Sequence, residues 1–129
     1  MKRYFLFDLD GTITDTGPGI MGSVQYALGE MGWPEQSGEF LRQFVGPPLE
    51  VSFRDFCGMN AAEAEEAIRL YRERYNAWGV YQSPLYPGME ATLNKLFQKA
   101  VVCVATSKRE QGARKIWPCG ASRGCLMWW

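Results

Sequence analysis

Two short, unbroken apolar runs constrain the fold of this 129-residue chain more than any other feature. Residues 4–7 (Tyr-Phe-Leu-Phe) end at an aspartate, and residues 101–105 (Val-Val-Cys-Val-Ala) end at Thr106. Apolar runs without polar alternation are typical of strands that are buried on both faces, as in a parallel sheet covered by helices. The sequence therefore predicts an α/β fold in which these two strands are parallel and are joined by a right-handed crossover.

The segment between the two strands is far longer than an ordinary connection and has a helical pattern. Apolar residues recur at spacings of three and four over residues 20–31. Asn60 and Glu63 have the spacing of a capping box that opens the longest predicted helix, and residues 89–98 form a further predicted helix before the second strand. We therefore expect a small helical domain inserted into the crossover. The expected domains are a core of residues 1–15 and 80–108, an inserted helical domain of residues 16–79, and an anomalous tail of residues 109–129.

The composition excludes several classes of function. The chain contains no histidine, which excludes hydrolases with a catalytic histidine and zinc or iron sites with histidine ligands. Because Lys plus Arg and Asp plus Glu each number 14, we expect no nucleic-acid partner and no membrane partner. The apolar run at residues 4–7 is too short for a signal peptide, and no C-x-x-C pair suggests zinc. We expect a cytoplasmic protein in which Cys57 and Cys103 are buried free thiols.

Two carboxylates, Asp8 and Asp10, directly follow the first predicted strand. Gly11 lets the chain turn sharply, so both carboxylates can face one crevice while Leu9 points back into the core. Paired acids bind a hard divalent cation, and Mg²⁺ favours one or two carboxylates together with phosphate oxygens. Without histidine, a carboxylate is the natural nucleophile and forms an aspartyl-phosphate, while the second carboxylate serves as general acid and base. The alternative is a solvated strand end, whereas the spacing excludes an EF-hand calcium loop.

The remaining phosphate oxygens would be held by backbone N–H groups around Gly11 and Thr12 and by the hydroxyl of Thr106 or Ser107. Ligand sites in open α/β sheets lie beyond the carboxyl ends of the strands, so both loops are expected to meet at one crevice. Lys108 comes next in the sequence and is expected to face solvent or to join the phosphate loop. The alternative for the two hydroxyls is that they cap the following helix.

The stretch Asp-Leu-Asp-Gly-Thr-Ile-Thr-Asp-Thr at residues 8–16 resembles the first motif of the haloacid dehalogenase-like (HAD) phosphatases. A helical insertion after this motif, a Tyr-Pro-Gly turn at residues 86–88 and a strand that leads into a Thr-Ser pair continue the resemblance, which covers residues 1 to about 108. Residues 44–49 (Phe-Val-Gly-Pro-Pro-Leu) are similar to the phosphoglycolate phosphatase and 5′-nucleotidase-like branch of the family.

This resemblance implies a Rossmann-like core with an incomplete parallel sheet and an inserted α-helical cap. It implies that Asp8 is the nucleophile and a Mg²⁺ ligand. It also implies that Asp10 is the general acid and base, with its backbone carbonyl as a further Mg²⁺ ligand, and that Thr106 or Ser107 binds phosphate. Within the cap, Arg42 is a candidate for contacting the non-phosphate part of the substrate, and the alternative is an exposed helix arginine.

The sequence departs from the family after the second motif. Family members carry a third-motif lysine and a fourth-motif acidic pair, but here no aspartate follows Asp55, and the only lysines after Ser107 are Lys108 and Lys115. Residues 109–129 have four basic and one acidic side chain (+3), against ten and thirteen (−3) in residues 1–108. We expect a C-terminally truncated member whose tail is out of frame; the alternative is a short protein completed by its tail or a second chain. A two-stranded sheet alone would be marginally stable.

We therefore expect a Mg²⁺-dependent phosphomonoester hydrolase, similar to phosphoglycolate phosphatase, that acts on a small phosphorylated metabolite through an aspartyl-phosphate intermediate. A 5′-nucleotidase and a sugar-phosphate mutase are the alternatives within the fold. A non-catalytic fragment or interaction module is the alternative from another class. The exact substrate and the oligomeric state are left open at this stage.

Overall fold

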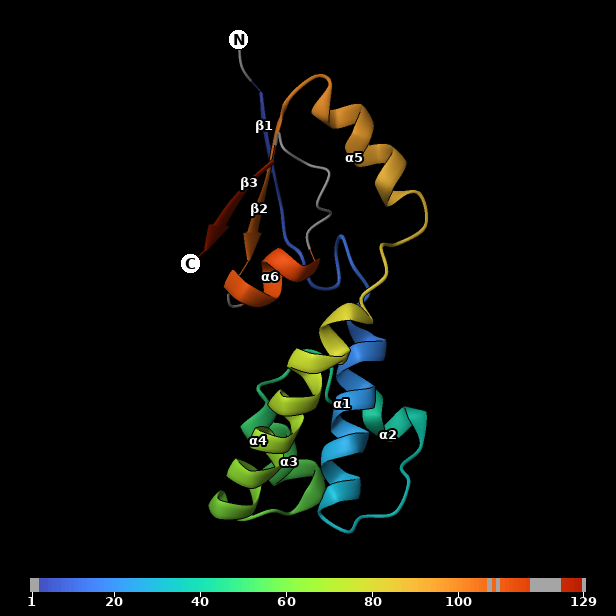
Figure 1. Cartoon of the computed structure of the whole chain (residues 1–129), viewed down its shortest axis with the longest axis vertical. Coiled ribbons are helices and arrows are strands. Elements are labelled where there is room, and N and C mark those ends of the chain that lie inside the picture. Colours follow the sequence, from blue (N-terminus) through green and yellow to red (C-terminus); the bar gives the residue numbers. More distant parts are fainter. Residues whose placement is uncertain (1–2, 107, 109, 117–123, 129) are drawn as a thin grey trace. The chain divides into compact units, whose positions relative to one another are not determined.

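The computed structural model describes residues 3–106, 108, 110–116 and 124–128, the last of these segments by its backbone. Figure 1 shows how the helices and strands follow one another along the chain. Their order is β1 (Tyr4–Phe7), α1 (Gly17–Glu30), α2 (Gly38–Arg42), α3 (Leu49–Cys57), α4 (Ala61–Ala77), the short 3₁₀ helix η1 (Gly79–Tyr81), α5 (Met89–Phe97), β2 (Val101–Thr106), α6 (Glu110–Ile116) and β3 (Gly124–Trp128).

The chain divides into two compact units. We call Met1–Thr16 together with Ser83–Trp129 the sheet unit, and Gly17–Gln82 the helical unit. The α/β class predicted from the sequence is confirmed, because parallel strands and helices alternate in the sheet unit while the intervening segment is helical. Among the described residues, no helix combines the length and the apolar composition that crossing a membrane requires.

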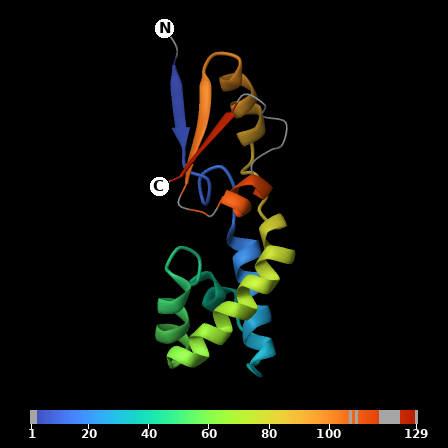
Figure 2. The same ribbon diagram turned by 60° about the vertical axis from the view of Figure 1, so that its left-hand side comes forward.

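The sheet consists of parallel strands in the order β1-β2-β3 (Figure 2). β1 pairs with β2 from Tyr4↔Val101 to Phe7↔Val104, as the sequence predicts for the two apolar runs. The prediction of a two-stranded sheet is wrong, because β3 pairs with β2 along its other edge. Its five residues, Gly-Cys-Leu-Met-Trp, form a short apolar run of the kind that a strand between covered faces requires. The segment expected to be an anomalous tail therefore contains both α6 and β3.

β1 is much more exposed than its apolar sequence predicts. The side chains of Tyr4 and Leu6 are 60% and 57% exposed, and Phe5 is also largely exposed. The prediction that this strand is buried on both faces is therefore wrong. The physical reason is its position: β1 lies at an edge of the sheet, and β2 is its neighbour on one side. β2, in contrast, is buried from Val102 to Thr106, because it has a strand on each side and the core of the sheet unit packs on one of its faces.

A small apolar core holds the sheet unit together. Leu9, Ile13 and Leu93 pack with Val102 and Val104 on one face of β2. Because Leu9 and Ile13 belong to the loop after β1, the core fixes the carboxyl end of this strand as well as the sheet. On the other face of β2, Cys103 is disulfide-bonded, so the expectation of a free thiol at this position is wrong, whereas Cys57 is a free cysteine as expected.

The helical unit has a separate core, in which α1 and α4 lie side by side (Figure 1). The predicted capping box starts α4: the Glu63 backbone N–H donates to Asn60 Oδ1 at 2.8 Å, and the Asn60 N–H donates to Glu63 Oε1 at 3.4 Å. Phe44, from the turn after α2, packs against Phe53 of α3 with ring centroids 5.1 Å apart. This aromatic pair links the two short helices, and both rings belong to the same apolar core as residues of α1 and α4.

The two ends of the helical unit meet through glycine. A Cβ atom placed on Gly19, in the first turns of α1, would lie 2.0 Å from the carbonyl oxygen of Gly79 in η1. A Cβ on Gly79 would in turn lie 2.5 Å from Ser23 Oγ and 2.8 Å from the carbonyl oxygen of Gly19. Side chains cannot occupy this space, so glycine at both positions lets the two backbones touch.

Candidate active site

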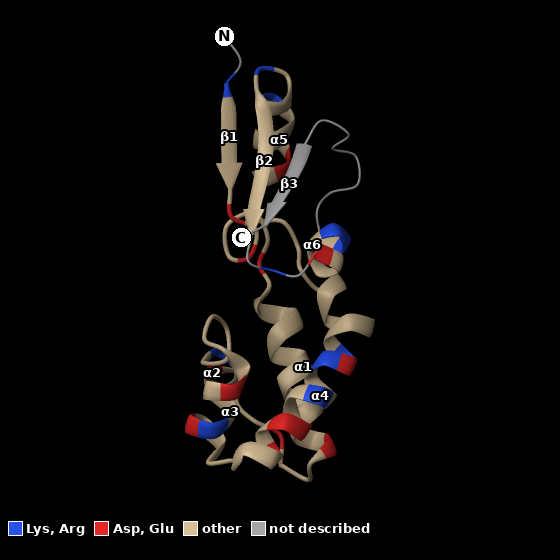
Figure 3. Cartoon of the chain, turned by 90° about the vertical axis from the view of Figure 1, so that its left-hand side faces the viewer, with Lys and Arg blue, Asp and Glu red and all other residues tan. Residues whose placement is uncertain are grey.

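The loop after β1 is a tight turn built around Leu9. The Leu9 carbonyl accepts hydrogen bonds from the N–H groups of Ile13 (3.0 Å) and Thr14 (3.2 Å), and its side chain is fully buried. Gly11 has φ of +75°, a backbone conformation that favours glycine, and its N–H donates to the Thr14 carbonyl at 2.8 Å. With Leu9 anchored inward, Asp8 is exposed and Asp10 half-buried at the carboxyl end of β1, where Figure 3 shows acidic residues in red.

The return segment before α5 holds this turn in place. The Asp15 N–H donates to the Pro84 carbonyl at 2.9 Å, and the Tyr86 N–H donates to the Ile13 carbonyl at 3.1 Å. Thr14 is fully buried and forms backbone bridges with both Asp10 and Leu85. Sequence reasoning did not assign Thr14 a role, although its place inside the motif, directly before Asp15, was a usable signal. The acidic turn is therefore held in place by a segment far from it in the sequence.

Lys108 lies beside Asp10. Its Nζ atom is 3.4 Å from Asp10 Oδ1, and the side chains are 14% and 36% exposed, respectively. Burial raises the pKa of the Asp10 carboxyl above its ordinary value, and the negative charge of Asp8 adds to this, whereas the Lys108 ammonium acts in the opposite direction. Among the described residues, the buried Asp10 Oδ1 has no hydrogen-bond partner, so Lys108 acts on it as a nearby charge.

Thr106 positions the backbone of Lys108. Its side chain is almost completely buried at the end of β2, and its Oγ1 accepts a hydrogen bond from the Lys108 N–H at 3.0 Å. This bond fixes the chain just after β2, from where the lysine side chain reaches Asp10. The sequence predicts Lys108 in the phosphate loop or in solvent, and nothing in the pattern of residues 106–108 indicates its pairing with a carboxylate of the other loop. The structure therefore brings Asp8, Asp10, Thr106 and Lys108 to one end of the sheet.

Gly11 and Thr12 are exposed on the turn, and the Thr12 N–H donates to the Leu9 carbonyl at 3.3 Å. Because the Gly11 N–H is also used within the turn, the expected backbone cradle for phosphate is not formed by these two groups. Ser107 lies outside the described residues. Arg42 is exposed in the last turn of α2, in the helical unit, and its expected contact with substrate stays a prediction.

The donor set at this turn fits a magnesium ion. Asp8 and Asp10 supply hard oxygen ligands, and Mg²⁺ is commonly held by one or two carboxylates while it keeps several waters. The Asp10 side chain already has the Lys108 ammonium as a cationic neighbour at 3.4 Å, so the exposed Asp8 carboxylate is the side chain of the pair that is left to bind an ion. Within the described parts of the chain, no cluster of three or more Asp, Glu, Cys or His side chains forms a complete protein cage.

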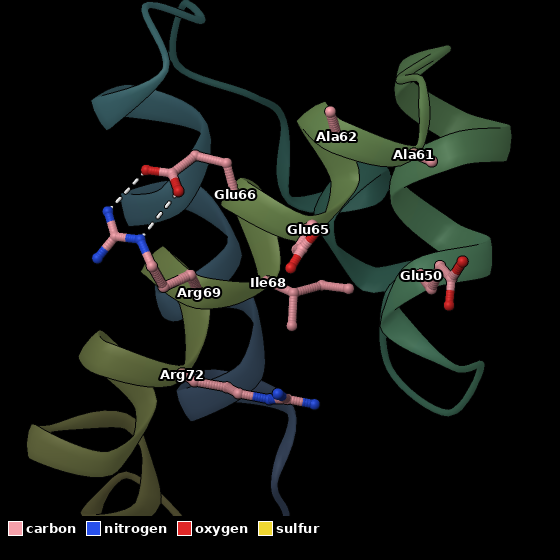
Figure 4. A pocket seen from close by; sticks show the side chains of 8 residues that line it. All are labelled: Glu50, Ala61, Ala62, Glu65, Glu66, Ile68, Arg69 and Arg72. Atoms are coloured by element: carbon pink, nitrogen blue, oxygen red, sulfur yellow. Dashed lines mark hydrogen bonds and ion pairs between the residues drawn. The ribbon is translucent and has the colours of Figure 1, made fainter.

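A pocket of about 750 Å³ lies on the helical unit, between α3 and α4 (Figure 4). None of the predicted site residues lines it. Glu66 and Arg69 at its rim are paired with each other at 2.6 Å, and both are well exposed, so their charges are satisfied locally. The pocket residues therefore offer no acid pair or phosphate-binding arrangement comparable to the turn after β1.

We expect the pKa of the Asp10 carboxyl to lie above that of an ordinary aspartate, because burial outweighs the opposing effect of Lys108. Lys108→Met should raise this pKa further, since it removes the charge that lowers it. Carbon-13 NMR titration of the side-chain carboxyls measures both values. Lys99→Met, which removes an exposed lysine with no effect on Asp10, is the control. An unchanged or lower Asp10 pKa in Lys108→Met would contradict the assigned ion pair.

Several named proteins are similar to this chain. A Pseudomonas aeruginosa protein named 5′-nucleotidase is 42% identical over 112 residues, which cover 86% of this chain and 51% of that protein. A Mycobacterium tuberculosis protein named tyrosine-protein kinase PtkA is 42% identical over 113 residues, which cover 86% of this chain and 38% of that protein. A Pseudomonas putida protein named phosphoglycolate phosphatase is 32% identical over 119 residues, which cover 86% of this chain and 43% of that protein. The chain thus spans about half the length of the curated relatives it matches or less.

Solved structures agree with this relationship. A haloacid dehalogenase-like family hydrolase from Streptococcus pneumoniae matches with a TM-score of 0.79 and 30% identity, covering 96% of this chain and 60% of that one. The Mycobacterium tuberculosis PtkA structure matches with a TM-score of 0.76 and 31% identity, covering 99% of this chain and 60% of that one. The sequence pattern of the haloacid dehalogenase-like hydrolases matches residues 5–117, which extends past residue 108 and includes α6. The resemblance predicted from residues 8–16 is thus confirmed, and the chain belongs to the haloacid dehalogenase-like hydrolase family.

Proposed function

We propose that this chain carries the phosphoryl-transfer turn of a Mg²⁺-dependent phosphomonoester hydrolase. The observation that carries the proposal is the meeting of two carboxylates with a lysine: Asp8 and Asp10 follow β1, and Lys108 Nζ lies 3.4 Å from Asp10 Oδ1. Relatives named 5′-nucleotidase and phosphoglycolate phosphatase support this chemistry, since each name denotes hydrolysis of a phosphate ester.

In the proposed reaction, Asp8 is the nucleophile. One of its oxygens, Oδ1, accepts the Leu9 N–H at 2.8 Å, which orients the carboxylate and leaves the other oxygen to attack phosphorus. A new P–O bond to Asp8 forms as the P–O bond to the substrate alcohol breaks, and the product is an aspartyl-phosphate. Water then attacks this phosphorus, releases inorganic phosphate and restores the Asp8 carboxylate.

Asp10 moves the protons in both steps. Its raised pKa, caused chiefly by burial, favours the protonated carboxyl that a general acid needs. In the first step this proton passes to the oxygen of the leaving alcohol. In the second step the resulting carboxylate accepts a proton from the attacking water, so Asp10 ends the cycle in its starting state.

Lys108 and Thr106 are proposed to bind the transferred phosphoryl group. The ammonium of Lys108 is held near the turn and would offset the charge of the phosphate oxygens. The Thr106 hydroxyl accepts the Lys108 N–H, and a hydroxyl that accepts a hydrogen bond still has its own hydrogen to donate. Mg²⁺ would be held by the Asp8 carboxylate and the Asp10 backbone carbonyl, where it would neutralise charge on the phosphate.

We further propose that the substrate is a small phosphomonoester, a 5′-nucleotide or phosphoglycolate, in line with the relatives' names. The helical unit is inserted directly after the acidic turn, between Thr16 and Ser83, and is proposed to act as the cap that selects the substrate. Arg42, as an exposed cation of this unit, is the proposed contact for the part of the substrate that is not transferred.

The proposal is tested by phosphate release from p-nitrophenyl phosphate, 5′-nucleotides and phosphoglycolate by the full chain. We expect release in the presence of Mg²⁺ and loss of release when EDTA is added, because the substrate phosphate needs a second positive partner. Asp55→Asn, a change in an exposed carboxylate of α3, should leave the rate unchanged. Phosphate release that is equal with Mg²⁺ and with EDTA, or no release from any of these esters, would contradict the proposal.

A further inference from the structure

Thr14 contacts the backbone on both sides of Asp10. Its N–H donates to the Leu9 carbonyl at 3.2 Å, and its own carbonyl accepts the Gly11 N–H at 2.8 Å. The Leu9 carbonyl belongs to the peptide unit before Asp10, and the Gly11 N–H belongs to the peptide unit after it. Both peptide units that flank the proposed general acid are therefore bonded to one residue, which also forms a parallel bridge with Asp10.

The side chain of Thr14 adds a contact that its backbone cannot make. This side chain is fully buried, and its Oγ1 donates to the Leu9 carbonyl at 3.5 Å. A buried hydroxyl that lacks a partner is unfavourable, so the hydroxyl favours the conformation of the turn in which the Leu9 carbonyl accepts it. Valine has nearly the shape of threonine but no hydroxyl, so this contact distinguishes the two residue types at position 14.

The return segment before α5 holds Thr14 from its other side. Thr14 forms an antiparallel bridge with Leu85, and the Tyr86 N–H donates to the carbonyl of the neighbouring Ile13 at 3.1 Å. Thr14 is therefore bonded to this segment as well as to the peptide units around Asp10. Because Thr14 itself is held in place, its bonds restrict where the Asp10 backbone, and with it the carboxyl group, can move.

We propose that Thr14 is a positioning residue, whose buried hydroxyl helps to hold Asp10 where its carboxyl group can pass a proton to the leaving oxygen of the substrate. The inference rests on the proposed function, in which Asp10 is the general acid. Proton transfer requires the donor within hydrogen-bond reach of the acceptor, so a small displacement of Asp10 lowers the rate. Thr14 acts through Asp10 and not on the reacting atoms, because its own side chain is fully buried.

The test compares two kinds of phosphate ester, hydrolysed by the full chain with Mg²⁺. An alkyl phosphate, either a 5′-nucleotide or phosphoglycolate, releases an alcohol that needs a proton, whereas p-nitrophenyl phosphate releases a stable anion that does not. Thr14→Val should therefore lower kcat/KM for the alkyl phosphate about tenfold and change the value for p-nitrophenyl phosphate by less than about twofold. Thr14→Ser keeps the hydroxyl and should bring the alkyl phosphate value to within about threefold of the original.

Ser52→Ala is the matched control, because it removes a buried hydroxyl of α3 that has no hydrogen-bond partner among the described residues. It should leave both kcat/KM values unchanged, and circular dichroism of every variant reports whether it is folded. An equal loss for both esters in Thr14→Val, or no loss for either, would overturn the proposal. A loss in Thr14→Ser as large as that in Thr14→Val would also overturn it.

Amide hydrogen exchange tests the same contact without any reaction. The Gly11 and Ile13 N–H groups are bonded within the turn, to the carbonyls of Thr14 and Leu9. Both amides should exchange at least about threefold faster in Thr14→Val and at the original rate in Thr14→Ser. Unchanged exchange in Thr14→Val would overturn the role of the hydroxyl. A chain that releases no phosphate from any ester would instead contradict the proposed function, while exchange would still decide whether the hydroxyl holds the turn around Asp10.

Discussion

Replacing Asp8 by asparagine is expected to lower phosphate release from every substrate by at least about a thousandfold. Asparagine has the shape of aspartate but its amide cannot form an acyl phosphate, so the covalent step is lost. The local structure should persist, because the Leu9 N–H, which now donates to Asp8 Oδ1 at 2.8 Å, can donate equally to the amide oxygen of asparagine. The measurement is the initial rate of phosphate release at saturating substrate.

Two further results sharpen this test. A phosphorylated form of the original chain, trapped by acid quenching during turnover with labelled substrate, should carry its label on Asp8, and Asp8→Asn should trap none. Asp55→Asn, which changes an exposed carboxylate of α3, should trap as much as the original chain. If Asp8→Asn retained the original rate, the assignment of Asp8 as nucleophile would be wrong.

Gly19→Ala is expected to have the largest effect on stability, a loss of about 3 kcal/mol in the free energy of unfolding of the helical unit. The added Cβ would lie 2.0 Å from the Gly79 carbonyl oxygen, and backbone atoms cannot move aside as the end of a flexible side chain can. α1 and η1 would have to separate, and the packing of Ser23 against Gly79 would be lost with them. Urea unfolding followed by circular dichroism at a helix-sensitive wavelength measures the change.

The matched control lies in the same helix. Gly29 of α1 has nothing within 4 Å of the position that its Cβ would occupy. Gly29→Ala should therefore leave stability unchanged or increase it by up to about 1 kcal/mol, through the better helix propensity of alanine. An equal loss in both variants would mean that the contact with Gly79 is not the cause.

Local patterns were sufficient to predict most of the helical unit and the acidic turn. The Asn60 and Glu63 spacing predicts the start of α4, which begins there with both hydrogen bonds of the capping box. The apolar run before Asp8 predicts a strand, and Gly11 predicts the sharp turn that its positive φ confirms. In each case the physical cause lies within a few residues of the feature that it determines.

The features that were missed depend on segments far apart in the sequence. The exposure of Tyr4 follows from which strands flank β1, and a run of four apolar residues does not contain that information. β3 pairs along the edge that β2 offers, and its run Gly-Cys-Leu-Met-Trp is apolar like the runs of β1 and β2, so this strand had a usable signal in the segment expected to be an anomalous tail. The pairing of Lys108 with Asp10 depends on how Thr106 bends the chain after β2, almost a hundred residues beyond the turn.

The contact between Gly19 and Gly79 also bears on how such a chain can be rearranged. The first and last turns of the helical unit touch at these glycines, and on the other side of the boundary the Asp15 N–H is bonded to the Pro84 carbonyl. The 66 residues of Gly17–Gln82 are therefore inserted into the sheet unit as a loop whose two ends lie next to each other. Closing such a loop costs little more entropy when it is lengthened or shortened. Helical units of different size and sequence whose ends lie equally close are therefore expected to fit between the same two strands while the acidic turn stays unchanged.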